Sequence, residues 1–91
     1  MAAIEEIENA LTLARVRLDE APDFELFVST VAQLEYLLSV VKGDERDRSR
    51  LKDIIVGHFA VREFEENDPE FAQALNAAQF IASKAARGLK V

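Results

Sequence analysis

The sequence predicts an all-α fold, a small antiparallel four-helix bundle. Apolar residues recur at alternating three- and four-residue intervals through most of the chain, and Gly and Pro together occupy only five of the 91 positions. The breaks between the periodic segments are short, so each helix is expected to return alongside the one before it. With 49% apolar residues, residues 1–91 fit one small folded domain and leave no room for a second.

The first predicted helix covers residues 3 to 20. Its apolar side chains fall on one stripe, formed by Ile4, Ile7, Leu11, Ala14 and Leu18. Pro22 disfavours helical geometry at the residue before it, and Asp23 is able to cap a new helix. We therefore expect the second helix to begin at Asp23.

The second predicted helix, residues 23 to 42, has the widest apolar stripe and is expected to be the central element. This stripe consists of Phe24, Phe27, Val28, Val31, Leu34, Leu37, Leu38 and Val41. Gly43 is expected to close the helix, because glycine adopts the left-handed conformation without a side-chain penalty. In the following segment, "KGDERDRSRLK" at 42 to 52, acidic and basic residues alternate, which is typical of a solvated turn.

The third and fourth predicted helices cover residues 47 to 66 and 69 to 87. One side of the third is expected to hold Leu51, Ile54, Ile55, His58, Val61 and Glu65. Gly57 predicts close packing against a neighbouring helix, since glycine inside a helix costs about 1 kcal/mol relative to alanine. Asp68 as N-cap and Pro69 at the first helical position mark the start of the last helix. Its packing face consists of Phe71, Leu75, Ala78, Ile81, Ala82 and Ala85.

The composition also limits the classes of partner. The chain has 17 acidic and 11 basic side chains, a formal charge of −6, which disfavours nucleic acid and anionic membranes. A partner with a basic surface is favoured instead. The chain has no cysteine, no basic and apolar leader and no long apolar run, which predicts a cytoplasmic protein.

The stretch "VREFEENDPEF", residues 61 to 71, concentrates negative charge. It holds five carboxylates, those of Glu63, Glu65, Glu66, Asp68 and Glu70. Their spacing matches neither a calcium loop nor a di-metal carboxylate bundle, so we expect no metal and no cofactor. A bundle this small has little room for a catalytic cleft, so we expect no enzymatic activity. The glutamates oppose the dipole of the third helix, which indicates either a solvated face or contact with a basic partner.

Two further residues, His58 and Tyr36, are candidates for a functional role. His58 is the single histidine, and histidine phosphotransfer domains are helical bundles with one exposed histidine. Those domains place lysine and glycine three and four residues later, where this chain has Val61 and Arg62. A half-buried packing histidine is the better interpretation. Tyr36 is either an amphipathic anchor for an interface or a core residue.

Three stretches resemble one known family: "AQLEYL" at 32 to 37, "RLKDIIVGHFAVREFEENDPEF" at 50 to 71 and "ARGLKV" at 86 to 91. This family comprises small all-helical immunity proteins of bacterial type VI secretion systems, which neutralise an effector toxin with NAD(P)+ glycohydrolase activity. The resemblance runs along most of the chain. It implies a protein that binds its toxin directly and blocks the active site, although a toxin of other activity, such as a nucleotide pyrophosphokinase, stays open.

We therefore predict a non-catalytic partner-binding protein whose partner is a cognate effector toxin. The residues predicted to contact the partner are Glu63, Glu66, Asp68 and Glu70 as charged groups and Tyr36 and Arg62 as anchors. One alternative is a helical adaptor or self-associating bundle without a toxin partner. A phosphotransfer domain is another, and a homodimer of the free protein also stays open.

Overall fold

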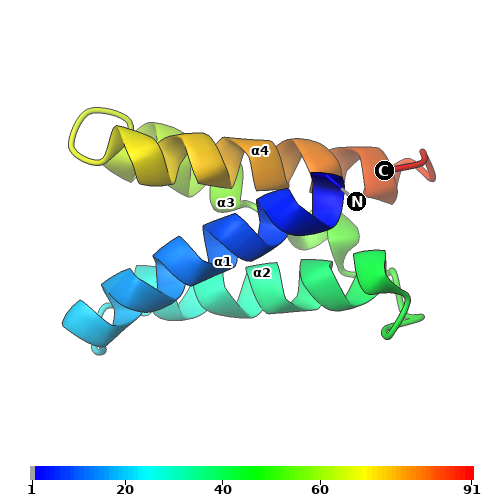
Figure 1. Cartoon of the computed structure of the whole chain (residues 1–91), viewed down its shortest axis with the longest axis horizontal. Coiled ribbons are helices and arrows are strands. Elements are labelled where there is room, and N and C mark those ends of the chain that lie inside the picture. The colour runs from blue at the N-terminus through cyan, green and yellow to red at the C-terminus, as the bar shows by residue number, and fades with distance from the viewer. Residues whose placement is uncertain (1) are drawn as a thin grey trace.

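The computed structural model describes residues 2–91 and is entirely helical apart from turns and loops, with no strand in that range. Three of its helices are long, and the segment before the last of them is shorter and irregular, as can be followed in Figure 1. The elements are α1 (Ala2–Glu20), α2 (Glu25–Lys42), η1 (Leu51–Asp53), α3 (Val56–Phe59), η2 (Ala60–Phe64) and α4 (Pro69–Ala86). The predicted all-α four-helix fold is confirmed. Among the described residues, no helix is both long enough and apolar enough to span a membrane.

The central element is α1, and the prediction that α2 occupies this place is wrong. Figure 1 shows α1 running obliquely across α2 and α4, and it packs extensively on both, whereas α2 and α4 have few direct contacts. Ala10 and Ala14 of α1 are fully buried. Small side chains on one stripe of α1 let both neighbouring helices approach it closely. This close packing, and not the greater width of the apolar stripe on α2, decides which helix is central.

The turn between α1 and α2 differs from the prediction in its cap. The backbone N–H of Phe24 donates to the carbonyl of Ala21 at 3.1 Å. This bond closes a turn over Pro22 and Asp23, so Phe24 occupies the N-cap position, without a side-chain cap, and the helix begins at Glu25. The predicted cap at Asp23 is therefore wrong. The other end of α2 is as expected, because Gly43 ends the helix with φ of 86°.

The third predicted helix, residues 47 to 66, is the largest error. Residues 44 to 50 form a loop, η1 is a single 3₁₀ turn, and α3 and the π-helical turn η2 make up one short helical segment. The buried residues explain the break: Ile54 and Val56 are both in the core, although a continuous helix would place two residues so spaced on opposite faces. The β-branched run at 54 to 56 also tolerates extended backbone.

The break changes which side chains face outwards. Val56, Ala60 and Phe64 are buried, whereas the predicted inner residues Ile55 and Val61 are 40% and 60% exposed. Two further predicted inner residues, His58 and Glu65, are also exposed. The interpretation of His58 as a half-buried packing residue is therefore wrong.

Candidate partner-binding surface

Two phenylalanines of the acidic stretch, Phe64 inside it and Phe71 at its end, anchor it to the core. Phe64 precedes most of its carboxylates and Phe71 follows them, and their ring centroids lie 4.9 Å apart. Phe27 of α2 stacks on Phe64 at 5.8 Å and meets Phe71 edge-on at 6.2 Å. Phe71 is fully buried and Phe64 is 8% exposed. The residues between them therefore form a short connection held at both ends by one aromatic cluster.

The three glutamates near Phe64 in the sequence are presented to solvent. Glu63, Glu65 and Glu66 are exposed, and none of them forms an ion pair with another residue in the range 2–91. A surface hollow of about 390 Å³ is lined by Val61, Arg62, Glu63, Glu65, Glu66 and Asn67. We call these six residues the acidic turn. Its charge is available to a partner because no internal cation neutralises the three glutamates.

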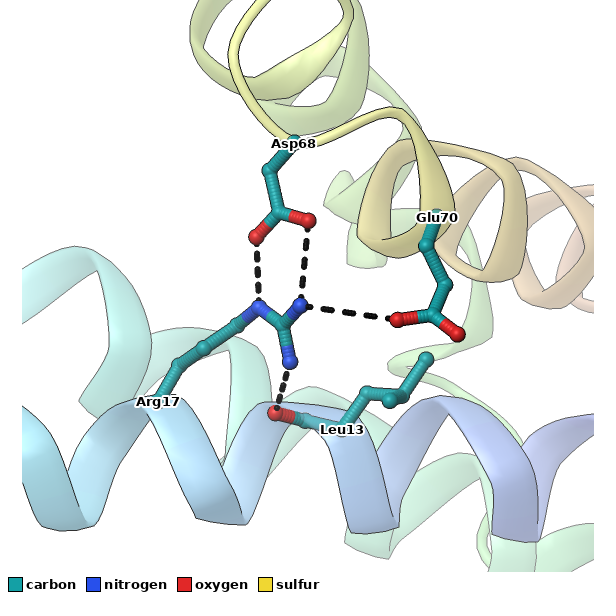
Figure 2. Close-up of polar contacts among 4 residues, drawn as sticks. All are labelled: Leu13, Arg17, Asp68 and Glu70. Carbon is teal, nitrogen blue, oxygen red and sulfur yellow. Dashed lines mark hydrogen bonds and ion pairs between the residues drawn. The ribbon is translucent and has the colours of Figure 1, made fainter.

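Asp68 has a different environment, shown in Figure 2. Its carboxylate accepts two hydrogen bonds from Arg17 of α1, at 2.6 Å from Nε and 3.0 Å from Nη2. Arg17 also donates from Nη1 to the carbonyl of Leu13, and its guanidinium lies 4.6 Å from the centre of the Phe71 ring. Two side chains far apart in sequence thus join α1 to the start of α4 with bidentate geometry.

This pairing explains the protonation of both groups. The hydrogen bond from Arg17 lowers the pKa of Asp68, against a smaller opposing effect of burial. The same bond raises the pKa of Arg17. The charged forms of both groups are therefore more favoured in the folded protein than in the unfolded chain.

The predicted helix start at Asp68 is correct in position but not in mechanism. Asp68 occupies the N-cap position and Pro69 begins α4. The Phe71 N–H is close enough to lower the pKa of Asp68 further, yet no capping hydrogen bond to this side chain is formed. The charged, bidentate partner Arg17 competes successfully with a single neutral N–H for the carboxylate.

Glu70 lies on the other side of this pair. One of its oxygens is 4.0 Å from Nη2 of Arg17, and its side chain is 77% exposed. It also lines a hollow of about 470 Å³ between α1 and α4, together with Glu6, Asn9, Gln73, Ala74 and Ala77. Glu70 is therefore only loosely held by the protein itself.

Tyr36 lies away from the acidic turn. Its hydroxyl donates to the carbonyl of Asp47 at 2.7 Å and accepts from the N–H of Arg50 at 3.3 Å. The Arg50 guanidinium covers the Tyr36 ring at 4.2 Å. Asp47 and Arg50 belong to the loop after α2. Figure 1 shows this loop and the connection into α4 at opposite ends of the molecule. Tyr36 thus holds the 44 to 50 loop.

The structure brings together only part of the predicted contact set. Arg62, Glu63 and Glu66 share one hollow, Asp68 and Glu70 follow it along the chain, and Tyr36 is elsewhere. The role of all six as partner contacts stays a prediction. Sequence reasoning missed Arg17, because no local pattern relates a residue of the first helix to a carboxylate 51 positions later.

No group of three or more potential metal ligands converges within residues 2–91. His58, the single histidine, is exposed.

Comparison with known proteins gives a consistent result. The Tsi6 family model matches residues 2–84. The chain is 42% identical over 91 residues to the immune protein Tsi6 of Pseudomonas aeruginosa, a match that covers 100% of this chain and 97% of that protein. A chain in the solved structure of Tse6 in complex with Tsi6 superposes with a TM-score of 0.92, at 41% identity, covering 99% of this chain and 96% of that one. A solved structure of Tsi6 from Pseudomonas aeruginosa gives a TM-score of 0.84 at 40% identity, covering 90% and 95%.

Proposed function

Because this chain belongs to the Tsi6 family, we propose that it is an immunity protein that binds an effector toxin related to Tse6 and blocks it without catalysis of its own. The observation that carries this proposal is the match, over nearly the whole chain, to a structure that contains Tse6 together with Tsi6. An inhibitor of this kind acts in the cytoplasm of the cell that makes it.

The toxin that fits best is an NAD(P)+ glycohydrolase. A site that binds a dinucleotide has to attract phosphate groups and is expected to present basic side chains. An immunity protein with a formal charge of −6 is electrostatically complementary to such a site. Complementary charge accelerates encounter, and covering the substrate entrance is sufficient for inhibition.

The acidic turn is the surface that we assign to this contact. Glu63 and Glu66 are exposed and have no ion-pair partner within residues 2–91, so a basic toxin surface replaces water rather than an existing internal bond. Val61, which lines the same hollow, adds an apolar side chain that is 60% exposed. Glu70 is a further available carboxylate, whereas Asp68 is already bound to Arg17.

The test is a binding measurement against the toxin domain encoded beside this gene. The variant Glu63→Lys with Glu66→Lys reverses two charges of the acidic turn, and Glu5→Lys with Glu8→Lys makes the same charge change on exposed residues of α1. We expect the first variant to weaken binding at least about tenfold, mainly through slower association at low salt, and the second to change it little. Equal effects of the two variants would show that net charge, and not this surface, matters.

Cellular NAD+ measures the function itself. Induction of the toxin domain alone should deplete NAD+, and co-expression of this protein should preserve it. A stable complex without NAD+ loss would keep the inhibitor role and assign the toxin a different chemistry. No complex at all would contradict the immunity proposal.

The alternative of a self-associating bundle rests on the apolar stripe of α2. The core of α2 is covered by the other helices, with Leu34 and Leu37 fully buried, and only Phe24 and Val28 of the predicted stripe are strongly exposed, at 46% and 43%. Sedimentation of the free protein distinguishes the two: a monomer removes the main reason for this alternative.

A further inference from the structure

The segment that carries the acidic turn begins without a cap of its own. Ile55 occupies the N-cap position of α3 and makes no side-chain capping bond, as expected for a hydrocarbon side chain. Ile54 before it is extended, with φ of −73° and ψ of 121°. The first N–H groups of this helix, and the last carbonyl before it, therefore need partners from elsewhere in the fold.

Two glutamines from other helices supply these partners. Gln33 of α2 accepts from the N–H of Ile55 at 2.7 Å. Gln79 of α4 uses both ends of its amide: Oε1 accepts from the N–H of Gly57 at 3.0 Å, and Nε2 donates to the carbonyl of Ile54 at 2.9 Å. We call this arrangement of Gln33 and Gln79 the amide clamp.

Each glutamine is itself held in place. Nε2 of Gln33 donates to the hydroxyl of Ser29 one turn earlier, at 3.0 Å, which orients its carbonyl oxygen towards Ile55. Gln79 lies directly against Gly57, where an added Cβ would be 2.7 Å from its Cγ and 2.9 Å from its Cβ. The glycine thus provides the room that Gln79 needs to reach the backbone on both sides of it.

The clamp holds the start of a segment whose other end is anchored as well. From Val56 the chain continues through η2 to Phe64, which is anchored in the aromatic cluster. This segment packs mainly on α4 and touches α2 little, so Gln33 supplies one of its few ties to that helix. Glu63 lies within the π-helical turn, and Glu66 follows just beyond it. Any rotation of the segment about Phe64 would move both carboxylates.

We propose that Gln79, supported by Gln33, is a positioning residue for partner binding, which holds the helical segment so that Glu63 and Glu66 face the partner in a fixed orientation. The inference rests on the proposed function. It adds that affinity depends on two amides that belong to other helices and lie outside the contact surface, because they fix the start of the segment that carries Glu63 and Glu66.

The experiment uses the full chain and the cognate toxin domain. Gln79→Met keeps the length of the side chain and removes both amide atoms, and Gln73→Met makes the same change on the same helix at an exposed residue without side-chain hydrogen bonds to residues 2–91. Binding is measured for each variant alone and combined with Glu63→Gln and Glu66→Gln. Amide hydrogen exchange at Gly57 is measured in the free protein.

We expect Gln79→Met to raise the exchange rate at Gly57 and to weaken binding about tenfold, because the segment loses two bonds that order it in the free protein and has to be ordered again when the toxin binds. Gln73→Met should change neither. In the background without the two carboxylates, the effect of Gln79→Met on binding should fall below about twofold, since coupled residues are not additive.

Unchanged affinity of Gln79→Met would overturn the inference, and so would an equal loss in both backgrounds, which indicates a merely structural role. If the two Glu→Gln changes alone leave binding unaffected, the assigned contact surface is wrong and the positioning role fails with it. Hydrogen exchange at Gly57 then still reports whether the amides hold the segment, so the two failures are distinguishable.

Discussion

Replacing Asp68 with asparagine is expected to destabilise the fold by about 2 kcal/mol at neutral pH, a value between those of exposed and buried ion pairs. The substitution separates two mechanisms. Asparagine is as good an N-cap as aspartate, so a capping role predicts almost no loss. The ion pair with Arg17 predicts a clear one, because the charge that holds the guanidinium is gone.

The magnitude follows from the geometry of the pair. Exposed pairs contribute about 0.2–1 kcal/mol, and removing one partner of a buried pair costs about 3–5 kcal/mol. The side chains of Arg17 and Asp68 are 18% and 30% exposed and share two hydrogen bonds, which places them between these limits. For a domain of this size, about 2 kcal/mol corresponds to a decrease of Tm by roughly 10 °C.

The pH dependence gives a second criterion. The pKa of Asp68 is lower in the folded state than in the unfolded chain. The pair therefore stabilises the fold at pH values above the unfolded pKa of about 4, and this contribution is lost as the pH falls through the folded pKa. The difference in unfolding free energy between wild type and Asp68→Asn should accordingly shrink towards zero in acid.

Urea unfolding at neutral pH and near pH 3 measures both effects. The control is Glu35→Gln, which breaks the Arg15–Glu35 pair, whose side chains are 55% and 52% exposed, and should cost at most about 0.5 kcal/mol. A loss for Asp68→Asn no larger than that of the control, or one that persists unchanged in acid, would refute this account of the ion pair.

Two glycine substitutions test the backbone. Gly57→Ala should destabilise the protein by about 1–3 kcal/mol in thermal unfolding, because the added Cβ would be 2.7 Å from Cγ of Gln79. This loss is expected although alanine has the higher helix propensity. Unchanged or increased stability would show that Gln79 moves aside freely. Gly43→Ala should cost about 1 kcal/mol of stability for a different reason: the space around Gly43 is open, but its φ of 86° is left-handed, which disfavours alanine. Gly43→Asn should lose less, because asparagine tolerates this conformation better. Equal losses for the two variants would contradict this explanation.

The long helices were predictable because the signals that specify them lie within or next to each helix in the sequence. The apolar period of α1 and α4 and the Pro69 start of α4 are local signals, and the structure has these helices within two residues of the predicted bounds. Gly43 and Gly57 were likewise interpreted correctly, since the left-handed cap and the tight contact are backbone requirements that only glycine meets there.

The third segment was not predictable in the same way. Its apolar residues allow several helical stripes, and the selection among them depends on Gln33, Gln79 and the ring of Phe27, which lie on other helices. The exposure of His58 follows from that selection. Periodicity alone therefore assigned a continuous helix where the chain breaks and restarts.

The sequence by itself determined that this chain is an acidic all-α domain and, through its resemblance to an immunity family, that its function is to bind a partner. The tertiary structure decided which charges are available for that binding. The sequence predicts Glu63, Glu66 and Asp68 alike as charged partner contacts, but Arg17 is close to Asp68 alone of the three. The physical reason is that a carboxylate is neutralised by whichever cation the fold brings within hydrogen-bond distance. That distance in space cannot be read from the separation of the two residues in the sequence.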